Sequence, residues 1–154
     1  MSQDNTRLEI SRYLAVPRTR IWEAWANPVH LAQWWCPKPW TTEVRALDFR
    51  PGGDFHTFMR GPDGGTSDNP GCFLEIAQFE RIVWTSTLTG GWRPTTPWLP
   101  LTAVFSLADE GNGTRYTAAC LHKDPDDCRK HEEMGFLEGW GTCITQLEAF
   151  AQKL

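Results

Sequence analysis

Apolar residues recur at steps of three and four over the last thirty residues of the chain, so they share one helical face. Asp124 stands where an N-cap belongs, and Pro125 fits the first helical position. We therefore predict one helix over residues 125–154, about 40 Å long. Its apolar face is formed by Phe136, Trp140, Cys143, Ile144, Leu147, Ala151 and Leu154.

Period-two alternation predicts seven strands before this helix. The first covers residues 8–16, and Arg12 shares its apolar face. Two short helices follow, one over 17–25 and one beginning at Pro28. The other six strands are predicted at 42–50, 53–60, 71–79, 81–89, 98–108 and 113–123. Short separators rich in Gly and Pro favour antiparallel pairing of neighbours.

The predicted fold class is therefore α+β, with a single domain over residues 1–154 and no internal repeat or linker. Seven strands spaced about 4.8 Å apart make a sheet about 30 Å wide, which must twist and curl. A helix about 10 Å across cannot fill the hollow of such a sheet. Either bulky side chains fill the space or a cavity remains, with the loops 61–70 and 89–97 as candidate rims.

Composition narrows the class of partner. The chain has nine Trp against two Tyr, and Trp clusters suit thick cores or pockets for flat apolar ligands. A net charge of −4 without a basic cluster argues against nucleic-acid binding. No apolar run is long enough for a membrane span, and the polar N-terminus does not resemble a signal peptide. Five irregularly spaced Cys indicate reduced thiols, so we expect a cytoplasmic protein with no membrane partner.

Several segments, in this order, resemble the heat-shock-protein-90 ATPase activator homologue family of the START-like, polyketide-cyclase-related superfamily. They are Ala15-Val16-Pro17, Ile21-Trp22-Glu23-Ala24-Trp25, Asn27-Pro28, Trp34-Trp35, Asp48-Phe49-Arg50-Pro51-Gly52-Gly53, Gly113-Thr114-Arg115 and Gly139-Trp140. The resemblance implies a helix-grip fold, in which a curved seven-stranded antiparallel sheet wraps around a long C-terminal helix with a cavity between them. The resemblance also implies that the relatives include proteins that bind hydrophobic ligands and co-chaperone domains, and that the family shares no catalytic motif.

We expect the cavity to be lined by aromatic and apolar side chains from several elements. The predicted ligand-binding residues are Trp35, His56, Phe58, Phe73, Trp84, Trp98, Phe105, Met134, Phe136 and Trp140. Trp98, together with Trp92, belongs to a Pro-rich loop and is expected at the rim. His56 lies on the strand with the least clear alternation. It could orient the polar end of a ligand or act as a base, or it could be a partly exposed strand histidine.

Cysteine and histidine chemistry gives weaker indications. Cys120, His122, Cys128 and His131 fall within twelve residues, but their spacing matches no established finger or ribbon, so we predict neither a metal nor a cofactor. No Cys has a His and an acid in a recognisable motif, and we assign no catalytic residue. Cys36 is expected to be the most exposed and reactive thiol. Arg12 on its apolar face needs a partner, for which we expect Asp48.

The leading hypothesis is a domain that binds an apolar or aromatic small molecule beneath the C-terminal helix. One alternative is a cyclase- or hydrolase-like enzyme that uses the same cavity with His56 as base. The other is a co-chaperone-type interaction module, which the resemblance suggests but which fold alone does not establish. A hydrophobic small molecule is the expected partner, a chaperone partner has no support in the residues, and a homodimer is left open.

Overall fold

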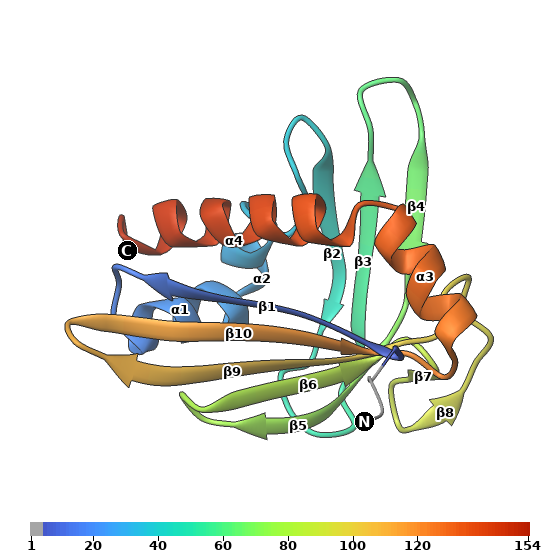
Figure 1. Cartoon of the computed structure of the whole chain (residues 1–154), viewed down its shortest axis with the longest axis horizontal. Helices are drawn as coiled ribbons and strands as arrows, with labels where there is room; N and C mark the ends of the chain where they lie inside the picture. The colour runs from blue at the N-terminus through green and yellow to red at the C-terminus, as the bar shows by residue number, and fades with distance from the viewer. Residues whose placement is uncertain (1–4) are drawn as a thin grey trace.

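The computed structural model describes residues 5–154 as two antiparallel sheets, a small ribbon and a C-terminal helical arm (Figure 1). The strands are β1 (Arg7–Leu14), β2 (Thr41–Leu47), β3 (Phe55–Arg60), β4 (Thr66–Asn69), β5 (Cys72–Ala77), β6 (Arg81–Thr85), β7 (Leu88–Thr89), β8 (Arg93–Pro94), β9 (Thr102–Glu110) and β10 (Gly113–Leu121). The helices are α1 (Arg18–Ala26), α2 (Pro28–Leu31), α3 (Pro125–Glu133) and α4 (Phe136–Ala151). Among residues 5–154, no helix has the length and apolar character that a membrane crossing requires.

The predicted seven-stranded sheet is divided into two. The main sheet has five strands in the order β1-β10-β9-β6-β5, and β2, β3 and β4 form a second sheet. The two sheets touch where Phe55 donates its backbone N–H to Gly71 O at 3.0 Å, and Phe73 donates to Gly53 O at 2.9 Å. Beyond that point β3 pairs with β4, a strand within the predicted loop 61–70, and so turns away from β5. Figure 1 shows this second sheet standing as a wall beside the main one.

The C-terminal helix begins as predicted but is two helices. The Asp124 side chain accepts a hydrogen bond from Asp127 N at 2.8 Å, and Pro125 occupies the first turn. Gly135 then adopts a φ of +91°, a left-handed conformation that ends α3 and that glycine tolerates best. The arm bends there (Figure 1), so that α4 packs on α1 and β1, while α3 contacts β1 and the start of α4. The prediction of one straight helix over 125–154 is therefore wrong.

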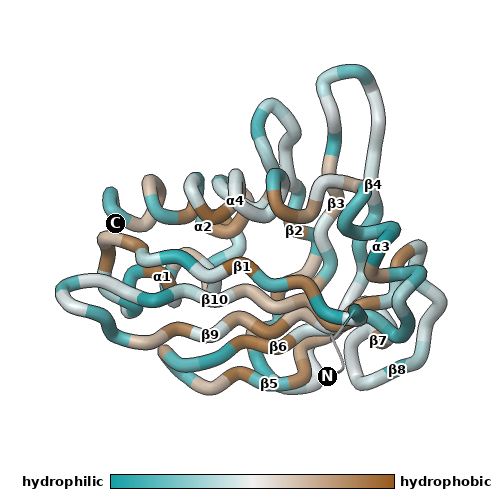
Figure 2. Tube along the Cα trace, viewed as in Figure 1, coloured by the Kyte–Doolittle hydropathy of each residue, from teal (hydrophilic) through white to brown (hydrophobic). Residues whose placement is uncertain are grey.

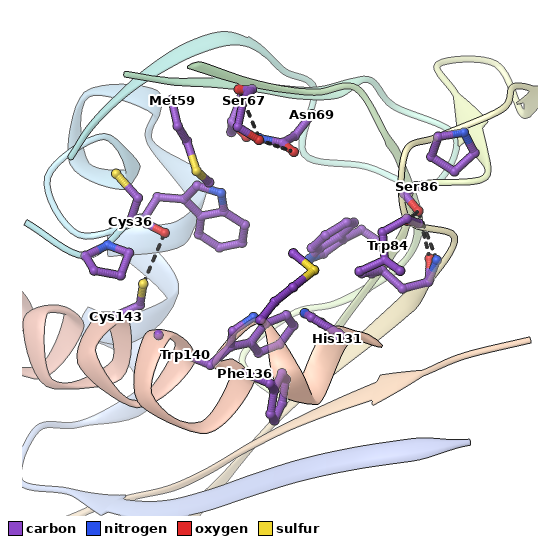
Figure 3. Close-up of a pocket in the computed structure, with 18 of the residues that line it drawn as sticks. Cys36, Met59, Ser67, Asn69, Trp84, Ser86, His131, Phe136, Trp140 and Cys143 are labelled. Atoms are coloured by element: carbon purple, nitrogen blue, oxygen red, sulfur yellow. Dashed lines mark hydrogen bonds between the residues drawn. The ribbon is translucent and has the colours of Figure 1, made fainter. Parts of the chain in front are cut away.

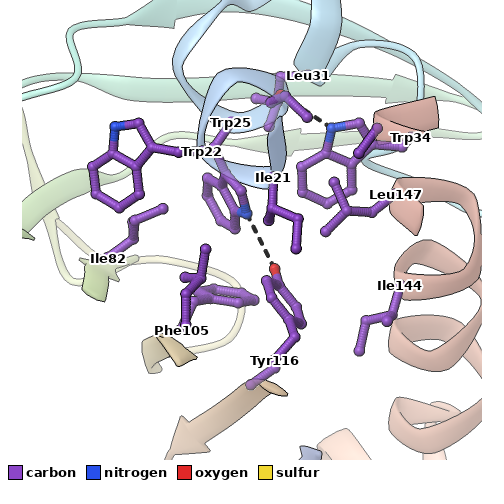
Figure 4. Packing of buried hydrophobic residues seen from close by; sticks show 14 of the residues in the cluster. Ile21, Trp22, Trp25, Leu31, Trp34, Ile82, Phe105, Tyr116, Ile144 and Leu147 are labelled. Carbon is purple, nitrogen blue, oxygen red and sulfur yellow. Dashed lines mark hydrogen bonds between the residues drawn. The ribbon is translucent and has the colours of Figure 1, made fainter. Parts of the chain in front are cut away.

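The core lies between α1, α4 and the concave face of the main sheet. Hydrophobic and hydrophilic segments both occur along its strands (Figure 2), and along β9 buried apolar residues of this core alternate with more exposed ones. Trp25 is fully buried at the centre, where its Nε1 donates to Tyr116 Oη at 3.1 Å (Figure 4). One face of α1 is apolar and packs into this core, because Ile21, Trp22 and Trp25 are all buried. These contacts anchor a helix too short to be stable alone.

Arg12 joins the first strand to α4. It lies on the inner face of β1, as predicted, and its Nη1 donates to Gly141 O at 3.2 Å and Thr145 Oγ1 at 3.1 Å. The expected partner is wrong, since Asp48 pairs with Arg50 at 2.8 Å. Asp48 follows β2 in the second sheet, while β1 is the edge of the main sheet next to α4.

Candidate ligand-binding cavity

A cavity of about 710 Å³ lies between the second sheet, the main sheet and the start of α4 (Figure 3). This volume is within the range of small-molecule sites, roughly 300–1,000 Å³. Seven of the ten predicted residues line it: Trp35, Trp84, Trp98, Phe105, Met134, Phe136 and Trp140. The hollow expected beneath the C-terminal helix is therefore present, and the divided sheet provides its second wall.

The inward face of β3 is the opposite of the one we expected. Phe55, Thr57 and Met59 line the cavity, whereas His56 and Phe58 do not. His56 Nε2 lies 2.6 Å from Asp68 Oδ1, and its side chain is 28 % exposed, which matches the alternative of a partly exposed strand histidine. Phe58 lies beneath the guanidinium groups of two arginines on the outer surface, Arg45 at 4.0 Å and Arg60 at 4.7 Å from its ring centroid. Both assignments to the cavity are wrong.

Phe73 is also misplaced in the sequence prediction. It is fully buried and stacks on Phe55 with ring centroids 4.7 Å apart, behind the cavity wall. Phe73 thus supports a lining residue without being one. Its contact with Phe49 at 5.3 Å completes the aromatic packing where the two sheets meet.

Aromatic rings dominate the cavity surface. Phe105 of β9 and Trp140 of α4 stack in parallel, with centroids 5.7 Å apart and an interplanar angle of 5°. Trp140 also contacts Phe136 at 4.6 Å, and Trp35 meets Phe55 edge to face at 5.2 Å. Rings held by one another in this way present fixed flat faces, which suits an apolar or aromatic guest.

The rim is formed by large exposed side chains. Trp98 is 54 % exposed, Met134 52 % and Trp40 37 %, so the cavity opens to solvent among them. Trp98 Nε1 donates to Asn69 Oδ1 at 3.1 Å, which joins the loop after β8 to β4. The rim prediction is thus confirmed for Trp98. Trp92 is exposed as well, but it covers Gly52 and does not line the cavity.

One buried donor in the lining is unsatisfied. Trp84 lines the cavity, and its Nε1 has no solvent exposure and no hydrogen-bond partner among residues 5–154. The nearby hydroxyl of Ser86 already donates to Leu99 O at 2.8 Å. An unpaired buried N–H costs about 1–3 kcal/mol, and since this one has no exposed surface, a guest in the cavity does not contact it directly.

Burial favours the neutral forms of two thiols and one imidazole in the lining. Burial raises the pKa of Cys36 despite a hydrogen bond from the Thr42 hydroxyl at 2.9 Å, and burial raises the pKa of Cys143 to about 12. Burial, together with the charge of His122, lowers the pKa of His131 to about 4. Cys36 is only 6 % exposed, so the prediction that it is the most exposed thiol is wrong.

Sequence reasoning missed some of the lining. Met59, Trp40 and Asn69 were not predicted, and neither was Gly139, which lies between two predicted residues on α4. The signal for Met59 was present, because it shares a strand face with the large apolar residue Phe55. Nothing in the local pattern marked Asn69, which gains its place only through the pairing of β4 with β3.

A long helix laid over a curved antiparallel sheet, with an apolar cavity between them, defines a START/Bet v1-like domain. Within that class, the family model described as Activator of Hsp90 ATPase homolog 1-like protein matches residues 15–152. The chain therefore belongs to the Activator of Hsp90 ATPase homolog 1-like family, as its sequence motifs indicated. No curated protein matches it.

Solved structures agree with this assignment. Protein NE0264 from Nitrosomonas europaea is 44 % identical over 99 % of this chain and 97 % of its own, with a TM-score of 0.93. Protein Ms6760 from Mycobacterium smegmatis is 28 % identical over 96 % of this chain and 91 % of its own, with a TM-score of 0.82. An AHSA1-like protein from Aeromonas hydrophila, 17 % identical over 96 % of this chain and 92 % of its own, shares the fold with a TM-score of 0.70.

Proposed function

We propose that this domain binds an apolar or aromatic small molecule in the cavity between α4 and the two sheets. The observation that carries the proposal is a cavity of about 710 Å³, lined by aromatic rings, in a chain of only 154 residues. Protein interiors are otherwise close-packed, and a void of this size forfeits contacts that a tighter sequence would make. A guest that fills the space would restore them.

The lining suggests what the guest looks like. Parallel rings of Phe105 and Trp140 favour a flat hydrocarbon or aromatic body. Entry would occur between Trp98 and Met134, the most exposed large apolar side chains of the lining.

Binding is favoured over catalysis by the state of the reactive groups. The thiols of Cys36 and Cys143 have raised pKa values, so thiolate nucleophiles are suppressed at neutral pH. His56, the base in the enzyme alternative, points to the outer surface and pairs with Asp68. The enzyme and co-chaperone alternatives stay predictions, as do the cytoplasmic location and the homodimer.

The test combines native mass spectrometry with a fluorescent probe. We expect the protein purified from cells to carry an extra mass of a few hundred daltons in part of the sample. After extraction of that ligand, anilinonaphthalene sulfonate should bind saturably at one site and quench Trp fluorescence. No bound mass together with no saturable probe binding would overturn the proposal.

A further inference from the structure

Three metal-ligating side chains meet behind the cavity, where β10 ends and α3 begins. Cys120 Sγ lies 3.7 Å from His122 Nε2 and 3.6 Å from His131 Nδ1, and the two imidazole nitrogens are 2.9 Å apart. All three side chains are buried, with exposures of 0 %, 8 % and 7 %. Each contributes one ligand atom, and these atoms lie within 4.8 Å of one another.

These distances are close to those of a tetrahedral zinc site. Zn–S bonds of about 2.3 Å and Zn–N bonds of about 2.05 Å place sulfur and nitrogen about 3.6 Å apart, and two nitrogens about 3.3 Å apart. The two sulfur–nitrogen distances therefore already fit. The imidazole pair would have to open by about 0.4 Å from its 2.9 Å separation.

The surroundings of His122 orient it as a metal ligand. Its Nδ1 lies 3.2 Å from Thr6 O, and since a carbonyl oxygen only accepts, Nδ1 carries the proton in this contact. Neutral His122 then presents the lone pair of Nε2 to Cys120 and His131. A ligating imidazole held by a backbone carbonyl through its second nitrogen is the usual outer-shell arrangement of protein metal sites.

We propose that Cys120, His122 and His131 form a binding site for a divalent cation of the zinc class. The donor set of one thiolate and two imidazoles suits Zn²⁺ and excludes Mg²⁺ and Ca²⁺, which prefer oxygen ligands. Cys128 lies one helical turn before His131 on α3 and is buried, but its sulfur does not belong to this three-residue cluster. His131 also lines the cavity, which places the cation directly behind the cavity wall.

Metal binding changes the protonation of Cys120 and His131. Burial raises the pKa of Cys120 to about 12, so this residue is a thiol in the metal-free protein and loses its proton to solvent when the metal–sulfur bond forms. The hydrogen bond between His131 and His122 is replaced by two metal–nitrogen bonds, and the proton on His131 Nδ1 moves to Nε2 through solvent. The same burial argues against Cys120 as a nucleophile.

The sequence prediction of no metal rested on ligand spacing along the chain. That rule describes fingers and ribbons, in which short loops bring the ligands together. Here the end of β10 and the last turn of α3 do so, because the Asp124 cap turns the chain back beside β10. The distances between the three ligand atoms support the site, and the spacing rule for fingers and ribbons does not describe it.

Cobalt titration of the reduced, metal-free protein tests the site. We expect one Co²⁺ per chain, with a thiolate-to-cobalt absorption band in the near ultraviolet and visible bands of a tetrahedral ion, all abolished by excess Zn²⁺. Cys120→Ala should remove the ultraviolet band, and His131→Gln should weaken Co²⁺ binding by at least about 10-fold. The matched control is Cys72→Ala, which alters another fully buried strand cysteine outside the cluster and should leave both properties unchanged.

Folding of each variant is checked by circular dichroism, and Cys120→Ser serves if Cys120→Ala does not fold. Cys128→Ala should keep the ultraviolet band at full intensity, because Cys128 lies outside the three-residue cluster. Absence of the band from the wild-type protein, or its persistence in the Cys120 variant, would overturn the proposal. Probe binding in the cavity is measured separately, so failure of the metal site leaves the proposed function untouched.

Discussion

Gly139 offers the most direct way to block the cavity without disturbing the fold. It lines the cavity on α4, one turn after Phe136 and one turn before Cys143, and a Cβ built on it meets no atom within 4 Å. A Trp introduced here would extend into the open space beside Trp140. Gly has a lower helix propensity than Trp, and it is about 1 kcal/mol less favourable than Ala inside a helix. The substitution of Gly139 by Trp therefore does not weaken α4.

The expected loss of affinity follows from contact area. An indole buries about 150–250 Å², and we take roughly 100 Å² of that as surface withdrawn from a bound probe. At about 25 cal/mol per Å² this amounts to about 2.5 kcal/mol. Gly139→Trp should therefore weaken binding of anilinonaphthalene sulfonate by about 10- to 100-fold. The melting temperature should stay level or rise, and Gly139→Ala should raise it by about 2–4 °C.

The assay is a fluorescence titration of the probe, paired with thermal melts. Leu137→Trp is the matched control, because Leu137 is 51 % exposed on the same helix and does not line the cavity. This control adds an indole to α4 without filling the site, so its affinity for the probe should match that of the wild type. Equal affinities for the Gly139 and Leu137 variants would refute the assignment of the binding site.

Three further predictions concern stability and reactivity. Tyr116→Phe removes the acceptor of the buried Trp25 Nε1–H and should lower the free energy of unfolding by about 1–3 kcal/mol. The melting temperature should fall accordingly, and an unchanged melting temperature would contradict this. Arg12→Ala should lower the free energy of unfolding by about 1–2 kcal/mol, whereas Asp48→Asn should change it by less than about 0.5 kcal/mol. Equal losses in the two variants would indicate that Arg12 pairs with Asp48 after all. Native Cys143, with its pKa raised to about 12, should react with iodoacetamide at least about 100-fold more slowly than in urea, and rapid native labelling by mass spectrometry would count against the raised pKa.

Strand 53–60 shows where sequence reasoning about the site reached its limit. Both of its faces carry large side chains, so period-two alternation could not say which one faces inward. The structure decides through the partner strand, because His56 and Phe58 meet Asp68 and the arginines on the solvent side. The residues predicted on α4 were placed correctly, since a 3.6-residue period leaves only one apolar face.

Residue patterns on their own determined the α+β class, the positions of seven of the ten strands among residues 5–154, the helix start at Pro125 and the family. These follow from local rules, because periodicity, caps and turn residues act within a few positions. Only the tertiary structure decided that the sheet divides, that the arm bends at Gly135, and that Cys120 meets two histidines. Such features depend on contacts between segments far apart in the chain, whose relative free energies are not contained in any local pattern.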